Sequence, residues 1–95
     1  MKKLYVTVGT DLSGSQQAVQ AGHALAEYMK TYDDWHNGTL VYLGASIRTL
    51  ENLAFKLKDK GIPHAKFHEP DIGDELTALA NATPGPFKKL SLLCL

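Results

Sequence analysis

Runs of apolar residues divide the chain into predicted strands. Alternating apolar residues predict a strand over residues 3–8. The continuous run LVYL predicts a second strand over residues 39–44, buried on both faces. A third, shorter strand is expected over residues 65–68. The composition of residues 76–82 fits either a helix or a strand, and residues 90–95 form a short apolar tail.

The 3.6-residue period of an amphipathic helix begins near residue 16 and ends near residue 32. Either Ser13 or Ser15 is a candidate N-cap. The expected apolar side, with Val19 at its edge, consists of Ala18, Gly22, Leu25, Ala26 and Met29. The other side carries a polar row made of Gln16, Gln20, His23 and Glu27. His23 is therefore expected within a row of polar side chains and away from the centre of the apolar stripe.

A second amphipathic helix is predicted over residues 47–60, with Ser46 as N-cap and Gly61 as the stop signal. The resulting order, β-α-β-α-β-β, indicates an α/β sandwich with a small mixed sheet. Ligands of such sheets gather at the carboxyl ends of the strands. The residues expected at those ends are Thr10, Asp11, Gly44 to Ser46 and His68 to Asp71.

Length and composition are those of one globular domain over residues 1–95, with 44% apolar residues. Ten basic and ten acidic residues balance, which argues against a general polyanion binder. No apolar run approaches the roughly 20 residues of a membrane span. Polar residues interrupt the first apolar stretch too early for an export signal, so a cytoplasmic location is expected. The lone Cys94 forms neither an internal disulfide nor a zinc-site spacing.

The first candidate site combines the polar row with a carboxylate. His23 can transfer a proton near neutral pH, and Asp11 or another loop carboxylate can orient it. Gln16 and Gln20 would line the same helix face. The alternative for His23 is a structural histidine at the edge between helix and sheet, bonded to backbone or water.

The second candidate site is an acidic loop after the third strand. It contains His68, Glu69, Asp71, Asp74 and Glu75. The register of a calcium-binding loop is absent, so a solvated acidic turn is favoured over a metal site. One carboxylate of this loop remains a candidate site residue. The sequence contains no recognised phosphate-binding glycine loop.

Two motifs resemble the type 2 peptidyl-tRNA hydrolase family, in particular a short bacterial and phage-type branch. The first is TDL at residues 10–12, followed by QQAVQAGHA at residues 16–24. The second is FHEPDIGDELTALA at residues 67–80. The resemblance extends over residues 3–82. It differs at Gln16, where the family has a lysine, and at Gly9, where the family has an arginine.

The resemblance implies a fold, an activity and a set of residues. The fold is a three-layer α/β/α sandwich with a four-stranded mixed β-sheet. The activity is hydrolysis of the ester between peptide and tRNA, without metal or cofactor, with peptidyl-tRNA as substrate and a homodimer as a possible state. The implied catalytic residues are His23, Asp71 and Thr77, with Glu69 as the alternative acid to Asp71. The expected substrate-binding residues are Asp11, Gln16, Gln20 and Glu69.

Three functional hypotheses follow. In the first, the protein is a minimal peptidyl-tRNA hydrolase in which His23 activates or positions water. In the second, it is a non-catalytic module that binds tRNA or protein on the same fold, as the glutamine at position 16 and the balanced charge favour. In the third, an unrelated small-ligand hydrolase reuses the pocket, because a fold does not determine a function.

Overall fold

A computed structural model of the chain describes residues 3–82 and 91–92. Its elements are β1 (Lys3–Gly9), α1 (Gly14–Thr31), β2 (Thr39–Ala45), α2 (Ile47–Asp59), β3 (Ala65–Glu69), the 3₁₀ helix η1 (Pro70–Ile72), β4 (Glu75–Asn81) and β5 (Ser91–Leu92). The predicted helices and the first three strands are confirmed to within two residues. The ambiguous segment at residues 76–82 forms strand β4. Of the predicted tail, only β5 is described, and Cys94 lies outside the described residues.

The strands form one mixed sheet in the order β3-β4-β1-β2-β5. β1 and β2 are parallel, whereas β4 runs antiparallel to both β1 and β3. β1, β2 and β3 therefore point the same way, and their carboxyl ends meet at one edge. The two-residue β5 adds to the outer side of β2. The expected four-stranded mixed sheet is thus present, with β5 as a short fifth strand.

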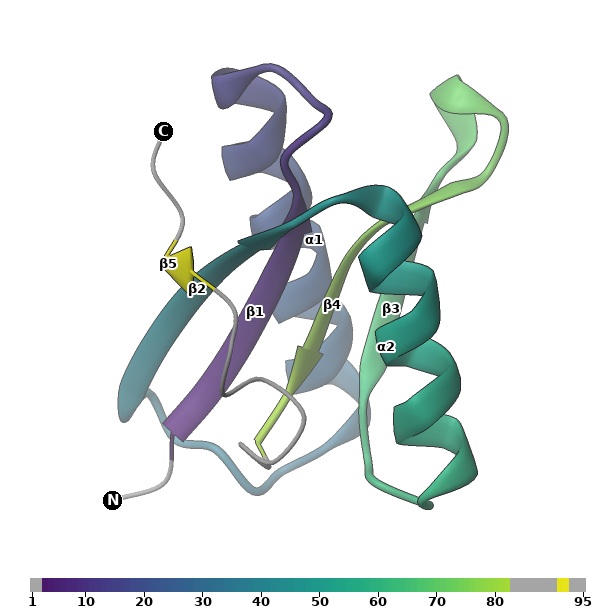
Figure 1. Cartoon of the computed structure of the whole chain (residues 1–95). Helices are drawn as coiled ribbons and strands as arrows, with labels where there is room; N and C mark the ends of the chain where they lie inside the picture. Colours follow the sequence, from purple (N-terminus) through teal and green to yellow (C-terminus); the bar gives the residue numbers. More distant parts are fainter. Residues whose placement is uncertain (1–2, 83–90, 93–95) are drawn as a thin grey trace.

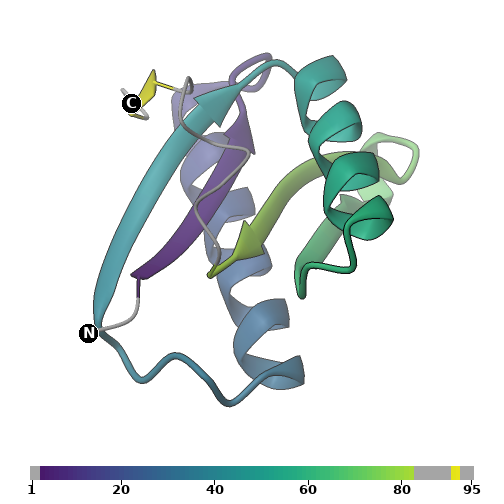
Figure 2. The same ribbon diagram turned by 60° about the horizontal axis from the view of Figure 1, so that its bottom comes forward.

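The two helices cover opposite faces of the sheet, and Figure 1 shows α2 in front of it and α1 behind it. Figure 2 shows the same separation from a second direction. The core on the α1 side contains Leu4, Val6, Val8, Ala21, Ala24, Tyr28, Trp35, Ala65, Ala78 and Ala80. The core on the α2 side contains Leu43, Leu50, Leu53, Ala54, Leu57, Leu76 and Leu79. Each fully buried Leu or Val contributes roughly 1.5–3 kcal/mol to folding.

The buried side of α1 differs from the prediction. The structure buries Gln17, Gln20, Ala21, Ala24 and Tyr28. Val19 and Met29, assigned to the apolar side, are instead 56% and 51% exposed. Alanines occur around the whole helix and give little contrast between its sides. The buried side is instead determined by Tyr28, whose large ring is buried, and by Gln17 and Gln20, whose side chains form hydrogen bonds.

The doubly buried strand is β4, and the prediction that β2 would be buried on both faces is wrong. Leu40 of β2 is 39% exposed, and most of the strand is only half-buried or exposed. In β4, every residue from Leu76 to Asn81 is buried. β4 is buried on both faces because it lies between β3 and β1 and contacts both helices. Helix α1 packs mainly on β1, β3 and β4, so β2 is covered less. Among the described residues, no helix is long and apolar enough to cross a membrane.

Candidate active site

Helix α1 begins at the carboxyl edge of the sheet, where loop and helix are joined by side-chain bonds. Ser13 is the N-cap, and its Oγ accepts a hydrogen bond from the Gln16 backbone N–H at 3.4 Å. The buried Gln17 side chain donates to the Leu12 carbonyl oxygen at 2.7 Å. These contacts satisfy backbone groups at the helix start and hold the β1–α1 loop against the helix. The polar row of α1 is thereby placed beside the end of β3.

A bulge in the β3–β4 hairpin turns Thr77 towards α1. Phe67 pairs with Ala78, but His68 pairs with Leu76, so Thr77 is the extra residue of β4. Ala78 packs in the core on the α1 side and Leu76 in the core on the α2 side. Strict alternation would send Thr77 to the α2 side, whereas its hydroxyl bonds to Gln20 of α1. Bulges re-aim side chains in this way and are enriched next to active sites.

Gln20 connects the three elements through its side-chain amide. The Thr77 hydroxyl donates to Gln20 Oε1 at 2.6 Å, and Gln20 Nε2 donates to Glu69 Oε1 at 2.8 Å. Gln20 is 4% exposed and Thr77 is fully buried. The amide orientation follows from chemistry, because a carboxylate oxygen accepts from the nitrogen of an amide. Nε2 has two hydrogens, and Glu69 accepts only one of them.

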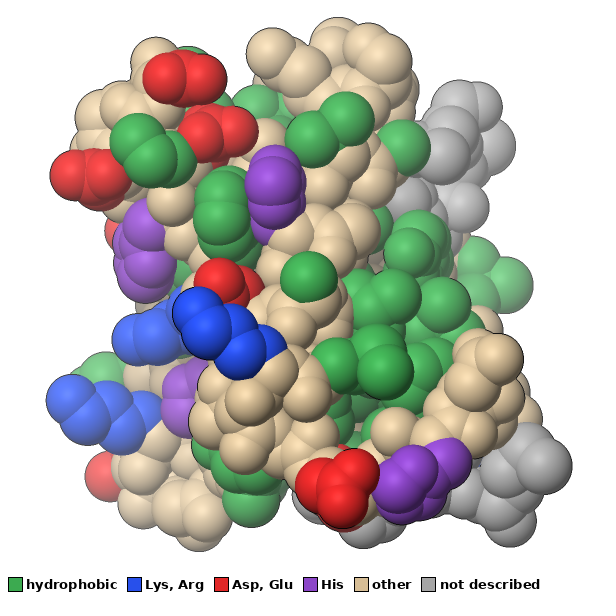
Figure 3. Space-filling view, turned by 180° about the vertical axis from the view of Figure 1, so that it is seen from behind, with side chains coloured by type: hydrophobic (Ala, Val, Ile, Leu, Met, Phe, Trp, Pro, Cys, Tyr) green, Lys and Arg blue, Asp and Glu red, His purple; other side chains and the backbone are tan. Residues whose placement is uncertain are grey.

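A pocket of about 220 Å³ opens beside this network, and we call it the α1 pocket. Its lining residues are Leu12, Ser15, Gln16, Val19, Gln20, Glu69, Asp71 and Ile72. The walls combine aliphatic side chains with two amides and two carboxylates, and they include no lysine or arginine. Figure 3, which views the α1 side, shows acidic side chains gathered at the corner formed by the β3–β4 connection. The pocket therefore has a negative lining and an oriented amide donor.

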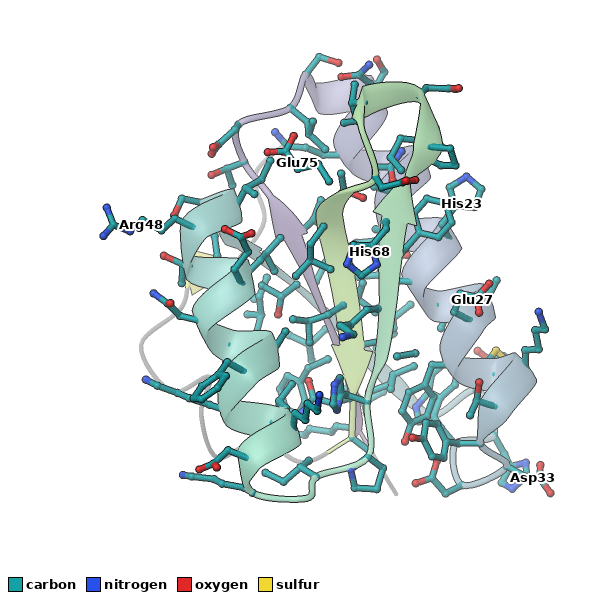
Figure 4. All side chains as sticks on the ribbon, turned by 90° about the vertical axis from the view of Figure 1, so that its right-hand side faces the viewer. His23, Glu27, Asp33, Arg48, His68 and Glu75 are labelled. Atoms are coloured by element: carbon teal, nitrogen blue, oxygen red, sulfur yellow. The ribbon has the colours of Figure 1, made fainter. Side chains whose placement is uncertain are left out.

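His23 lies one helical turn beyond Gln20, outside the residues that line the α1 pocket. Its ring stacks on Phe67 of β3, with a centroid separation of 4.2 Å and an interplanar angle of 9°. Figure 4 shows His23 on the outer surface of α1. The side chain is exposed, so stacking fixes the ring plane while the ring edge remains accessible. His23 is thus positioned by β3 and neighbours the pocket without forming its wall.

A second hollow lies on the other side of the β3–β4 connection, and we call it the α2 groove. It has a volume of about 650 Å³ and is lined by Glu51, Ala54, Phe55, Lys58, Lys66, His68, Ile72, Gly73, Asp74, Glu75 and Leu76. Figure 4 shows His68 on the sheet edge between the two helices, away from His23. The charged side chains of the groove are exposed, and they form neither salt bridges nor hydrogen bonds with other described residues. Ile72 contributes to both hollows, so η1 is the wall between them.

Gly9, at the position where the resembling family has an arginine, has no room for a side chain. A Cβ atom built there would lie 2.8 Å from Cγ1 of Ile47, the first residue of α2. Both residues are buried. The close packing of α2 on the end of β1 therefore excludes a cation from this position.

The far end of α1 is anchored by Tyr28, away from the pocket. Its hydroxyl donates to Asp34 Oδ1 at 2.8 Å, and its ring is 1% exposed. Burial of the phenol raises the pKa of Tyr28, and the hydrogen bond and negative charge of Asp34 raise it further. Trp35, also buried, donates from Nε1 to the Thr39 carbonyl oxygen at 3.2 Å. These bonds secure the α1–β2 connection and leave Tyr28 a structural residue.

Comparison with known proteins gives a fold and no function. No family model matches the chain, and no curated protein matches it. A solved structure from Agrobacterium tumefaciens strain C58, a protein of unknown function called Atu0240, is similar with a TM-score of 0.77. The match covers 98% of each chain at 11% sequence identity. The arrangement of helices and strands is thus shared by a chain of very different sequence.

The structure brings most of the predicted site residues to one place. Gln16, Gln20, Glu69 and Asp71 line the α1 pocket, and Thr77 bonds to Gln20 beneath it. His23 lies beside this group, and Asp11 lies exposed in the β1–α1 loop outside the pocket lining. The aliphatic wall residues Leu12, Val19 and Ile72 were not predicted as site residues. Val19 was assigned to the edge of the apolar side of the helix, and Leu12 and Ile72 are apolar residues within polar loops.

Within residues 3–82 and 91–92, no group of three or more His, Cys, Asp and Glu side chains is arranged to hold a metal ion. The acidic residues after β3 diverge to the two sides of η1, with Glu69 and Asp71 in the α1 pocket and Asp74 and Glu75 in the α2 groove. Gly73 and Asp74, with φ of 68° and 58°, form the left-handed turn that separates the two pairs. Of the two candidate acids, Glu69 is held by Gln20, whereas Asp71 is exposed.

Proposed function

We propose that this protein is an ester hydrolase of the peptidyl-tRNA hydrolase type, with the α1 pocket as its active site. The observation that carries the proposal is the fixed amide of Gln20. Its oxygen accepts from Thr77, one of its hydrogens goes to Glu69, and Gln20 is one of the residues that line the pocket. A donor held in advance in this way is suited to a carbonyl oxygen that gains charge during acyl transfer.

The juxtaposition of the two resembling motifs also supports the proposal. Gln20 belongs to the first motif, and Glu69 and Thr77 belong to the second, 49 and 57 residues away. The resemblance implies functional roles for all three residues. Their direct hydrogen bonds give the two motifs a common centre, as a shared active site requires.

His23 is the candidate proton acceptor in this reaction. The accessible imidazole edge takes a proton from water, whose oxygen bonds to the acyl carbon of the ester. The carbonyl oxygen then carries negative charge, which the Gln20 N–H stabilises. Collapse of this intermediate breaks the bond to the ribose oxygen, and the histidine returns the proton to that oxygen. The products are a carboxylic acid, which releases its proton to water at neutral pH, and a tRNA with its hydroxyl restored.

The direct test is the release of tRNA from aminoacylated and N-acetylaminoacylated tRNA. The proposal predicts turnover by the wild-type protein and a loss of roughly 10²–10⁴-fold in His23→Phe, the contribution of a general base. His23→Phe keeps an aromatic ring on Phe67 and removes only the ring nitrogens, so its fold should be retained. Equal background rates for wild type and variant would refute the proposal.

A second candidate, a non-catalytic binding module, is favoured by one observation. The lining of the α1 pocket contains two carboxylates and no lysine or arginine, and Gln16 stands where a lysine is expected. Lysine or arginine at such a site would attract the phosphates of a tRNA substrate. Their absence from this lining removes that electrostatic contribution to substrate binding. The module hypothesis predicts saturable binding of tRNA or protein without ester cleavage. Turnover that depends on His23 would exclude it.

A further inference from the structure

We propose that the α2 groove and the outer edge of β3 bind an extended polypeptide segment, which pairs with β3 as an additional strand. The segment carries a carboxylate near one end and a cationic side chain near the other, both on the face that enters the groove. This surface is separate from the α1 pocket, so binding there is independent of the proposed hydrolase activity. Three features carry the proposal: the edge of β3, its uncovered face in the groove, and the separation of charges along the groove.

β3 is the outermost strand on its side of the sheet. It pairs with β4 on one side, and no described strand lies on its other side. The backbone N–H and C=O groups along such an edge are a template for another strand. β3 has five residues, so its edge is roughly 17 Å long at about 3.4 Å per residue. That length suits an extended segment of about five residues.

The face of β3 within the groove is open to a ligand, because α2 packs on β4 and β1 rather than on β3. Lys66 and His68 extend from β3 into the groove and are exposed. Phe67, between them, turns to the α1 side and stacks on His23. On the α2 wall of the groove, Phe55 is 70% exposed and offers an aromatic surface to a ligand side chain.

The charged side chains of the groove are separated by sign along its length. α2 and β3 run in opposite directions, so the end of α2 adjoins the start of β3 (Figure 4). The basic end consists of Lys58, in the last turn of α2, and Lys66. The acidic end, next to η1, consists of Glu51, Asp74 and Glu75. A ligand whose charges have the matching order is therefore attracted at both ends.

These charges determine which segments the edge accepts. None of the charged side chains of the groove forms a salt bridge with another described residue. A lysine on an edge strand opposes pairing with a neutral or basic strand, because its ammonium group would lose water without gaining a partner. A segment with a carboxylate beside Lys66 and an amine or guanidinium beside Glu75 supplies both partners. Its side chains between these charges lie near His68 and Phe55, where apolar groups gain buried area.

The probe is a short blocked peptide of alternating valine and threonine, with a glutamate near one end and a lysine near the other on the same face of the strand. A second peptide has lysine in place of the glutamate, and a third has threonine in place of both charges. Fluorescence anisotropy measures binding to the wild-type protein, Lys66→Glu and Lys30→Glu. Lys30 is the matched control, because it is an exposed lysine in the last turn of α1, outside the groove.

We expect saturable binding of the first peptide by wild type and Lys30→Glu, with shifts of the Lys66 and His68 backbone amides in nuclear magnetic resonance spectra. Lys66→Glu should bind this peptide roughly 3–30-fold more weakly, because repulsion replaces attraction. The same variant should recover affinity for the second peptide, in which the charge is exchanged as well. The uncharged third peptide should bind more weakly than the first.

Three binding results would overturn the proposal: no saturable binding below about 1 mM, equal affinity for the charged and uncharged peptides, or an equal loss in Lys66→Glu and Lys30→Glu. Backbone shifts confined to the α1 pocket would overturn it too. Self-association of the wild-type protein that Lys66→Glu abolishes would identify a second copy of this chain as the occupant of the edge, and would replace the proposed peptide partner.

Discussion

The α1 pocket and the α2 groove lie on the two sides of η1 and differ in how their polar groups are held. The groove is the larger hollow, about 650 Å³ against about 220 Å³. Its Lys58, Lys66 and His68 are exposed and without partners among the described residues. The smaller pocket has Gln20 bonded on two sides and buried Thr77 beneath it.

The comparison shows that the hollow with the larger volume is not the one with the better ordered polar groups. Exposed lysine side chains lose conformational freedom when they bind a ligand, whereas the Gln20 amide is already ordered in the folded protein. A donor that needs no reorganisation stabilises a developing charge more effectively than a mobile one. The smaller hollow is therefore the better candidate for chemistry.

Among the variants that compare the pocket with the groove, the largest expected effect is on turnover after replacement of Gln20. Gln20→Met keeps the length of the side chain and removes the amide, which is the proposed oxyanion donor. The rate of ester hydrolysis should fall roughly 10²–10³-fold. Lys66→Met, the matched substitution in the α2 groove, should leave the rate near that of wild type. A loss in Lys66→Met as large as in Gln20→Met would move the active site to the groove.

A second prediction concerns stability and uses two buried threonines. Thr77→Val removes the hydroxyl that donates to Gln20 Oε1, leaving that oxygen without its donor, and should lower the free energy of unfolding by about 1–3 kcal/mol. Thr7, also fully buried, has an Oγ1 without a hydrogen-bond partner among the described residues. Thr7→Val should therefore be neutral or stabilising. Urea denaturation of both variants is the measurement, and equal losses would contradict the network described for Gln20.

A third prediction uses pH to probe the α1 side. The folded state raises the pKa of Tyr28 above its ordinary value near 10. The unfolded chain therefore releases this proton at lower pH than the folded protein does. Stability from the neutral phenol is complete below about pH 10 and is lost as the pH rises further. Above about pH 10 the free energy of unfolding should fall more steeply with pH in wild type than in Tyr28→Phe. Parallel pH profiles would be evidence against the Tyr28–Asp34 bond.

The smallest effects are expected in the α2 groove. Lys58→Ala, Lys66→Ala and His68→Ala each remove an exposed side chain that has no partner among the described residues. Each should change the free energy of unfolding by less than about 0.5 kcal/mol. Thermal and urea unfolding can measure this. A loss above about 1 kcal/mol in any one of them would mean that the groove is more ordered than its contacts indicate.

The sequence was sufficient for both helices, for the first three strands and for the edge at which the candidate residues lie. Strand alternation and the Ser46 cap are local signals, and the folded chain retains them. Of the predicted polar row, Gln16 and Gln20 line the α1 pocket and His23 stacks on Phe67 of β3, but the row does not lie opposite the core, because Gln20 is buried. The burial of Gln20 was not predicted, because it depends on partners 49 and 57 residues away.

The bulge at Thr77 was also beyond sequence reasoning. Residues 76–82 carry no glycine or proline that would mark an irregular strand. The bulge arises because Leu76 and Ala78 must enter cores on opposite faces although only one residue lies between them. That requirement is set by tertiary packing. The alanines of α1 occur around the whole helix, so the apolar pattern alone assigned the wrong side of it as buried.

The central claim is that the fixed amide of Gln20 is the ligand-contacting donor of the α1 pocket. Nuclear magnetic resonance of the side-chain and backbone amides tests it most directly, with an aminoacyl-adenosine in which an amide replaces the ester as the probe. Addition of this compound should shift the side-chain amide resonances of Gln20 and the backbone amide resonances of Glu69 and Asp71, while the backbone amide resonances of Lys66 and His68 stay unchanged. Shifts centred on Lys66 and His68, with an unchanged Gln20 amide, would contradict it.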